Sequence, residues 1–150
     1  MRDPETKRDL ATIDPVLKAY AKDVFAMPDE DLVKLTAREE RAYKNVGENM
    51  AKYRLVAEVT KAKYCYAGLQ VGQKIVLNGL TIDKEASDCP LCMGAVGPLL
   101  HNVLVYYDRC LTNGDLEAPL PPVSCVDSGF EAGELSLGQV LLDVRMEPRS

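Results

Sequence analysis

The first fifty residues carry apolar side chains at helical spacing. Asp14 followed by Pro15 is typical of a helix start, and apolar residues then recur every three or four positions as far as Phe25. A proline followed by three acidic residues predicts a second, short helix. The sequence Thr-Ala-Arg-Glu at positions 36–39 is a capping box, which predicts a third helix to about Met50. The apolar stripe of this helix is thin, so we expect the N-terminal helices to lie against another surface.

From residue 52 the apolar positions recur at every second residue, which is the spacing of half-buried strands. This alternation predicts strands over residues 53–60 and 140–146. A further strand is predicted at 74–77, before an Asn-Gly turn. A helix is predicted from the Gly-Pro step at residue 97 to Asn113, because asparagine readily ends a helix.

The remaining segments complete the expected architecture. Three prolines predict an extended connector over residues 117–122, followed by a short strand within 123–126. The first twelve residues are expected to be a polar tail. The fold class predicted is therefore α+β, with a helical N-terminal arm (1–50) followed by a small β-sheet domain with one main helix (51–150).

Composition narrows the classes of function. A chain of 150 residues suits one domain with an appendage. The net charge of −5 argues against a nucleic-acid partner, since binding to phosphates needs clustered Lys and Arg. The longest apolar run falls far short of the ~18 residues that cross a bilayer. Trp is absent, so tyrosines at 64, 66, 106 and 107 are expected to fill the core, with an aromatic-lined pocket as the alternative.

The N-terminal residues are polar and acidic, unlike a secretory signal, so we expect a cytoplasmic, reducing location. In that setting five cysteines are more often ligands, reactive thiols or buried residues than disulfides. All five follow residue 60. The strongest pair is Cys89 and Cys92, because a Cys-Pro-x-Cys turn points both sulfurs to the same side at the separation of metal ligands.

Two further thiols occupy loop positions that suit metal ligands. Cys65 and Cys125 each follow a predicted strand and precede a turn, although either position also suits a small buried residue. With Cys89 and Cys92 they would supply four thiolates, which bind zinc or an iron–sulfur cluster equally well. If only three thiols bound a cluster, one iron would stay open to substrate.

Other residues have a structural and a chemical interpretation. Cys110 falls near the end of the predicted helix, where we expect it to pack against the core. His101, early in the same helix, is expected at the surface, with a ligand role as the alternative. Asp127 is either a turn former or an acid–base group. A thiol-redox function for the Cys-x-x-Cys pair is the second choice, because Asp88 would raise the pKa of Cys89.

Three short motifs carry a resemblance to a known family. They are Cys65 with Gly68 and the sequence Val-Gly-Gln-Lys at 71–74, Cys89-Pro90 ahead of a helix, and Cys125-Val126-Asp127 near Gly129. On these, residues 52–147 resemble a small uncharacterised cysteine-containing family found mostly in anaerobic bacteria and archaea. The resemblance implies that the shared thiols are Cys65, Cys89 and Cys125, and that the setting is anaerobic, which favours an iron–sulfur cluster over zinc.

The function expected from these observations is a small metal-binding accessory subunit of a larger intracellular enzyme. The metal would be iron–sulfur or zinc, bound by the four thiols named above, and larger subunits would dock on the helical arm. Whether the chain is itself an enzyme stays open. The alternatives are a small lyase-like iron–sulfur enzyme with an open iron, with Asp127 or His101 as its acid–base group, and a Cys-x-x-Cys redox protein.

Overall fold

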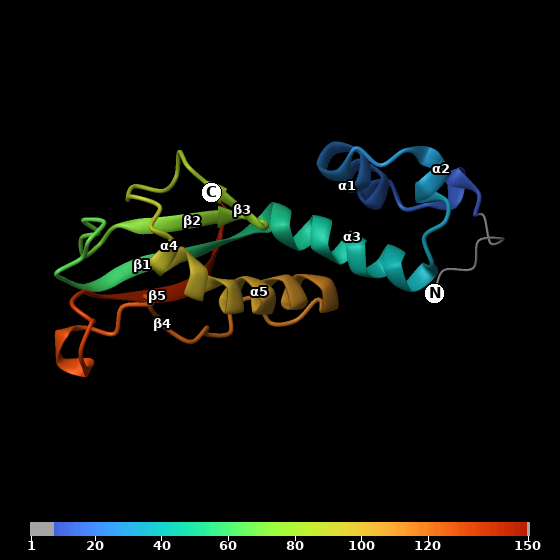
Figure 1. Cartoon of the computed structure of the whole chain (residues 1–150). Helices are drawn as coiled ribbons and strands as arrows, with labels where there is room; N and C mark the ends of the chain where they lie inside the picture. Colours follow the sequence, from blue (N-terminus) through green and yellow to red (C-terminus); the bar gives the residue numbers. More distant parts are fainter. Residues whose placement is uncertain (1–7, 150) are drawn as a thin grey trace.

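A computed structural model describes residues 8–149 of the chain. The arm contains a 3-10 turn and three helices: η1 (Leu10–Thr12), α1 (Pro15–Phe25), α2 (Asp29–Leu32) and α3 (Ala37–Lys52). The sheet domain contains these elements: β1 (Tyr53–Lys63), β2 (Lys74–Asn78), β3 (Thr81–Asp83), α4 (Met93–Val96), η2 (Gly97–Leu99), α5 (Leu100–Thr112), β4 (Val123–Ser124), η3 (Phe130–Ala132) and β5 (Gln139–Pro148). The predicted α+β class, with helices preceding the sheet, is confirmed (Figure 1).

The helix ends follow the local sequence. The Asp14 carboxylate accepts a hydrogen bond from the amide of Val16 at 2.8 Å, as an N-cap does. Thr36 and Glu39 form the predicted capping box, in which each side chain accepts from the other's backbone amide. Asn113 ends α5 in the left-handed conformation. These signals lie within one turn of helix, so they predict boundaries well.

The prediction of a polar tail over residues 1–12 is wrong for residues 8–12, while residues 1–7 lie outside the described part of the chain. The Arg8 amide donates to the Val33 carbonyl at 3.0 Å, and the Arg8 guanidinium pairs with Glu40. Residues 10–12 form η1 and the Leu10 side chain packs against the arm's apolar cluster. This segment is held by contacts to residues more than twenty positions away, which no local pattern shows.

The described strands form one antiparallel sheet in the order β3-β2-β1-β5-β4. The long central pair, β1 and β5, runs from Tyr53 opposite Pro148 to Lys63 opposite Gln139. Its register shifts between Val59 and Lys61, so Thr60 forms a bulge. Beyond the bulge Ala62 packs with the core, and the strand extends past the predicted end at residue 60.

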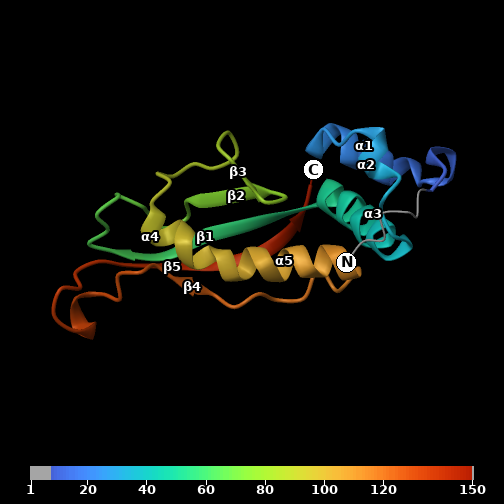
Figure 2. The same ribbon diagram turned by 45° about the vertical axis from the view of Figure 1, so that its right-hand side comes forward.

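One face of the sheet is covered by α4 and α5 (Figures 1 and 2). The side chains on this face include Leu55, Ala57, Ile75, Leu142 and Val144, all buried. Tyr106 of α5 is fully buried against them, and its hydroxyl donates to the Tyr53 carbonyl at 3.1 Å. The expectation that tyrosine fills the core holds for Tyr106, but Tyr64 and Tyr66 are exposed.

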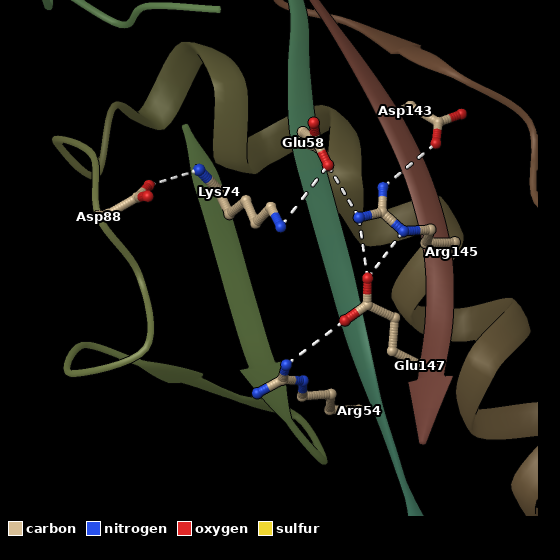
Figure 3. Close-up of polar contacts among 7 residues, drawn as sticks. All are labelled: Arg54, Glu58, Lys74, Asp88, Asp143, Arg145 and Glu147. Carbon is tan, nitrogen blue, oxygen red and sulfur yellow. Dashed lines mark hydrogen bonds and ion pairs between the residues drawn. The ribbon is translucent and has the colours of Figure 1, made fainter. Parts of the chain in front are cut away.

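The opposite face of the sheet carries paired charges, drawn in Figure 3 with α5 behind the strands. Arg145 contacts Glu58 and Glu147 at 2.8 Å each, and Glu147 also contacts Arg54 at 3.4 Å. The amine of Lys74 lies 3.8 Å from Glu58. The Arg145 guanidinium is the largest cause of a lowered Glu58 pKa. Positive and negative side chains alternate along and across the strands of this face. Opposite charges on neighbouring strands stabilise a sheet, so we assign these pairs a structural role.

The arm joins the sheet domain through α3. Val46 and Met50 of α3 belong to the main core, whereas α1, α2 and the start of the arm enclose a separate small cluster around Leu17 and Leu32. The side chain of Asn49 donates to the Cys110 carbonyl at 3.1 Å, and α3 lies beside α5 in both views (Figure 2). The apolar stripe of α3 therefore packs on α5 of the same chain and, through Tyr43, on the arm's own cluster around Leu17. No helix within residues 8–149 is long and apolar enough to span a membrane.

Candidate functional site

Three loops meet at the end of the sheet that lies farthest from the arm (Figure 1). The first follows β1, the second precedes α4, and the third lies between β4 and β5. Strand pairing between Lys63 and Gln139 brings the first loop beside the third. The amide of Val126 donates to the Gly94 carbonyl at 2.9 Å, which ties the third loop to the start of α4, directly after the second loop. The first and third loops carry one cysteine each and the second carries two, Cys89 and Cys92, so backbone bonds bring together thiols that are distant in sequence.

Cys65 belongs to the loop after β1. The preceding Tyr64 has a φ of +50°, and the Cys65 carbonyl accepts from the Gly68 amide at 3.1 Å, so the chain turns sharply here. The thiol is half-buried and packs beside the main core. This is the strand-end loop position that the sequence predicts.

Cys125 follows β4 and is bound to β5 through backbone and sulfur. Its amide donates to the Val140 carbonyl at 2.9 Å, and its sulfur accepts from the Val140 amide at 3.2 Å. The thiol donates to the Asp127 carbonyl at 3.1 Å. An amide donor aimed at a cysteine sulfur also stabilises a thiolate, which is the form that binds metals.

Cys92 lies at the N-cap of α4. It lines the same cavity as Cys65 and Cys125. A methyl group on Gly94 would meet the Cys92 sulfur at 3.5 Å and a Val126 methyl at 3.2 Å. The absence of a side chain at Gly94 therefore lets Val126 of the third loop pack closely against α4.

The three thiols line one cavity of about 160 Å³. Its walls are otherwise formed mainly by apolar and small residues: Tyr66, Ala67, Leu69, Gly94, Ala95, Val126, Asp127, Gly138, Gln139 and Val140. Tyr66, on the loop after β1, lines the cavity and is exposed to solvent. No lysine, arginine or histidine belongs to this lining, so within the described residues the cavity wall consists of the cysteines, apolar surface, the Asp127 carboxylate and the polar groups of Tyr66 and Gln139.

Cys89, the fourth predicted ligand, does not line the cavity. Its thiol donates to the Lys74 carbonyl at 3.5 Å, at the beginning of β2. Asp88 holds this loop on β2, because its carboxylate accepts from the Lys74 amide at 2.6 Å and its amide donates to the Lys74 carbonyl (Figure 3). Burial, and secondly the charge of Asp88, raises the pKa of Cys89. The predicted direction of this shift is confirmed.

The described residues do not contain a preformed metal centre. In the chain from residue 8 to 149, no group of three or more His, Cys, Asp or Glu side chains is arranged to hold a metal ion. The predicted four-thiolate site of Cys65, Cys89, Cys92 and Cys125 is therefore not assembled as a coordination shell. The structure brings Cys65, Cys92 and Cys125 to one cavity and leaves their sulfurs apart.

The other candidates take the structural roles that the sequence favoured. Cys110 is fully buried in the main core, and burial raises its pKa to about 11. His101 is exposed on α5. The Asp127 carboxylate accepts from the Ser136 hydroxyl and from the amides of residues 129, 137 and 138, which lowers its pKa to about 2. It is a turn-forming aspartate held in its ionised state.

One residue at the cavity was not singled out from the sequence. A methyl group on Gly138 would lie 2.7 Å from the Tyr64 carbonyl oxygen, closer than real contacts allow. Gly138 therefore permits the loop of Cys65 to touch the start of β5. The close approach depends on strand pairing across seventy-four residues, so no local signal could have found it.

Comparisons of the chain with protein-family models, with curated proteins and with solved structures found no match.

Proposed function

We propose that this protein binds a thiophilic metal centre, zinc or an iron–sulfur cluster, through Cys65, Cys92 and Cys125. The observation that carries the proposal is that three loops, joined by backbone hydrogen bonds and strand pairing, place three of the five cysteines in the lining of a single cavity. Thiolates are the ligands that zinc and iron–sulfur clusters prefer. The resemblance to proteins of anaerobes favours the iron–sulfur cluster.

Metal binding would draw the three sulfurs together from the positions that they take in this structure. The thiols lie on loops and at a helix N-cap, where rotation about χ1 and small loop shifts cost little compared with moving a strand. The amide of Val140, 3.2 Å from the Cys125 sulfur, already supplies one of the hydrogen bonds that stabilise bound thiolates. The geometry thus supports a site that closes on its metal.

The accessory-subunit role is supported by exposed apolar surface beside the arm. A groove of about 410 Å³ lies between α1 and the turn after β2, lined in part by Tyr20, Phe25 and Leu80. Phe25 is 54% exposed and Leu80 is 57% exposed. Large apolar patches of this kind commonly mark protein interfaces. We propose that a larger subunit of an intracellular enzyme docks there.

The redox alternative has less support. A Cys-x-x-Cys redox pair needs a thiol with a lowered pKa, whereas the Cys89 pKa is raised and its thiol is bonded to a backbone carbonyl. The lyase-like alternative needs an acid–base group in the cavity. Among residues 8–149 the one carboxylate in the lining is that of Asp127, which accepts four hydrogen bonds.

Metal analysis of anaerobically purified protein tests the metal proposal. We expect about one equivalent of zinc, or iron with inorganic sulfide, in the wild type. A triple variant with serine at 65, 92 and 125 should contain none. Cys110→Ala is the matched control, since it removes a thiol from the core and should leave the metal content unchanged. Protein that stays metal-free after reconstitution with zinc and with iron and sulfide would contradict the proposal.

Size-exclusion chromatography with light scattering of protein from its native source tests the accessory role. We expect a complex of fixed stoichiometry with a larger subunit, lost when Phe25 and Leu80 are both changed to Asp. Lys84→Ala, on the exposed loop after β3, is the control. A stable monomer of the wild type would argue against a partner.

A further inference from the structure

Three free thiols gather at the end of the sheet that lies farthest from the arm. All five cysteines lie in the described part of the chain and are free, and three of them, Cys65, Cys92 and Cys125, are half-buried and line one cavity. Cys110 is fully buried in the core, so reagents in solution do not reach it. Half-buried thiols can exchange with disulfides, and the geometry of the backbone then decides which two can form a bond.

Cys92 and Cys125 are brought together at the start of α4. The Val126 amide donates to the Gly94 carbonyl at 2.9 Å, which fixes the residue after Cys125 against α4. A methyl group on Gly94 would lie 3.5 Å from the Cys92 sulfur and 3.2 Å from a Val126 methyl, so both side chains border one small space. Cys92 is the N-cap of α4 and Cys125 directly follows β4. Both side chains lie outside the regular elements, so they can change rotamer at small cost.

Cys65 is separated from Cys125 by a strand. In the sheet, β1 and β4 lie on opposite sides of β5. Cys65 follows the end of β1, where Lys63 pairs with Gln139, whereas Cys125 is hydrogen-bonded to Val140 from the β4 side. Two strand spacings place these backbones about 9–10 Å apart, and a disulfide needs Cα atoms within about 4.4–6.8 Å. A bond between Cys65 and Cys125 would therefore need the first loop to shift past β5.

Cys89, the neighbour of Cys92 in sequence, is held at β2. Its thiol donates to the Lys74 carbonyl at 3.5 Å. The Asp88 carboxylate accepts from the Lys74 amide at 2.6 Å and attaches this loop to the strand. Burial, and secondly the charge of Asp88, raises the pKa of Cys89, which lowers its fraction of reactive thiolate. A bond within the Cys-x-x-Cys sequence is therefore disfavoured.

We propose that Cys92 and Cys125 form a reversible disulfide when the protein meets a low-molecular-weight disulfide such as oxidised glutathione. The bond would join the end of β4 to the start of α4 and close the cavity between them. The proposal needs only the two thiols and does not depend on the proposed metal site. It assigns redox chemistry to a pair of cysteines that the sequence spacing does not indicate.

The reaction consists of two successive thiol–disulfide exchanges. The Val140 amide donates to the Cys125 sulfur at 3.2 Å, which stabilises a thiolate there, so Cys125 is the attacking group. Its thiolate forms a mixed disulfide with one half of the oxidant and releases the other half as a thiolate. The Cys92 thiolate then attacks the Cys125 sulfur and releases the second half. Two protein thiols are oxidised to one disulfide, and the oxidant is reduced to two thiols, which take up the two protons.

Peptide mapping of the metal-free protein tests the pairing. The full chain is reduced, treated with EDTA, exposed to oxidised glutathione, alkylated, and digested with trypsin and Glu-C. This digestion separates Cys110 from Cys125, because Glu117 lies between them. We expect a disulfide between peptides 86–109 and 118–131 as the major product, and dithiothreitol should reverse it.

Variants assign the bond to single residues. The link should persist in Cys89→Ala, which leaves Cys92 as the one thiol of its peptide. It should be lost in Cys92→Ser and in Cys125→Ser. Cys65→Ser is the matched control, since it removes a thiol from the same cavity and should keep the link in full. Circular dichroism of each variant shows whether the fold is retained.

Every other product overturns the proposal. A major bond between Cys89 and Cys92, or one that contains Cys65, assigns the disulfide to another pair. Bound glutathione without a link between two protein sulfurs, or thiols that stay reduced, shows that Cys92 and Cys125 do not meet. A chain that binds metal but fails this test loses only the disulfide. A chain that passes it and never binds metal loses only the metal site.

Discussion

The arm and the sheet domain are stabilised in different ways. The sheet domain encloses a core drawn from nearly every element between α3 and β5, with Tyr106 and Leu142 fully buried in it. The arm encloses a much smaller cluster and relies on caps and charges, such as the pair of Lys44 with Asp14 at 2.9 Å. The comparison indicates that the two regions unfold with different free energies, and that α3, which belongs to both, links them.

A matched pair of leucine truncations tests this comparison most strongly. Leu142 in β5 and Leu32 in α2 are both fully buried. We expect Leu142→Ala to lower the free energy of unfolding of the whole domain by about 2–5 kcal/mol. Leu32→Ala should increase hydrogen exchange of the arm amides and leave the sheet amides protected from exchange. Urea unfolding measures the free energy of unfolding, and residue-resolved hydrogen exchange measures the protection of each region. If Leu32→Ala reduced protection from exchange equally across the chain, the arm and the sheet domain would be one cooperative unit.

Gly138→Ala probes the cavity end of the sheet. The new methyl group would lie 2.7 Å from the Tyr64 carbonyl, so the loop of Cys65 must move away from β5. We expect a loss of about 1–3 kcal/mol in stability and a clear loss of bound zinc or iron, because the loop of Cys65 moves away from the other two cysteines. Gly97→Ala is the control, since a methyl group there meets nothing within 4 Å. Unchanged metal content in Gly138→Ala would show that this loop contact is not needed for metal binding.

Removal of the capping box should affect the arm alone. Thr36 accepts from the Glu39 amide at 3.2 Å at the start of α3. We expect Thr36→Ala to cost about 1 kcal/mol, detected as earlier loss of helical circular dichroism on heating. Thr36→Ser is the control that keeps the hydroxyl. If the amides of β1 lost as much protection from hydrogen exchange as those of the arm, α3 would transmit the change to the sheet.

The smallest expected effect is acid loosening of the arm. The ion-paired hydrogen bond from Lys44 lowers the pKa of Asp14, and the Asp14 amide, followed by Arg8, lowers the pKa of Glu40. Groups with lowered folded pKa values contribute stability above their unfolded values of about 3.9 and 4.3, and lose it as pH falls through the folded values. We expect exchange of arm amides to rise below about pH 4 before that of β1 and β5. Lys44→Met should weaken this pH dependence, and an unchanged profile would exclude Asp14 as its source.

Much of the architecture could be predicted from local pattern. The cap at Asp14, the capping box at Thr36 and the stop at Asn113 are confirmed, because each depends on groups within one helical turn. The strands β1 and β5, predicted from alternation, are confirmed, and burial alternates along β5 as expected. In β1, however, Leu55, Val56 and Ala57 are all buried, so the alternation of burial is interrupted there. The bulge at Thr60 could not be predicted, since it depends on register with β5.

The candidate site was predicted less completely. Sequence spacing paired Cys89 with Cys92, but the structure turns Cys92 to the cavity and holds Cys89 at Lys74. The spacing of two cysteines in the sequence shows that their sulfurs can lie near each other. The direction in which each side chain points depends on the neighbouring strand to which its loop is bound. The exposed Tyr64 and Tyr66 were expected in the core for lack of other aromatics, and the turn at Tyr64 directs them outward.

The amino-acid sequence by itself determined the helical arm, the strands β1, β2, β4 and β5, the burial of Cys110 and the loop positions of the other thiols, because these follow from spacing and from groups that act within a few residues. The short strand β3 was not predicted. Only the tertiary structure decided that Cys65, Cys92 and Cys125 share a cavity, that Cys89 does not, and that α3 packs on α5. Those outcomes depend on strand register and backbone hydrogen bonds between distant segments, whose energies no local pattern contains.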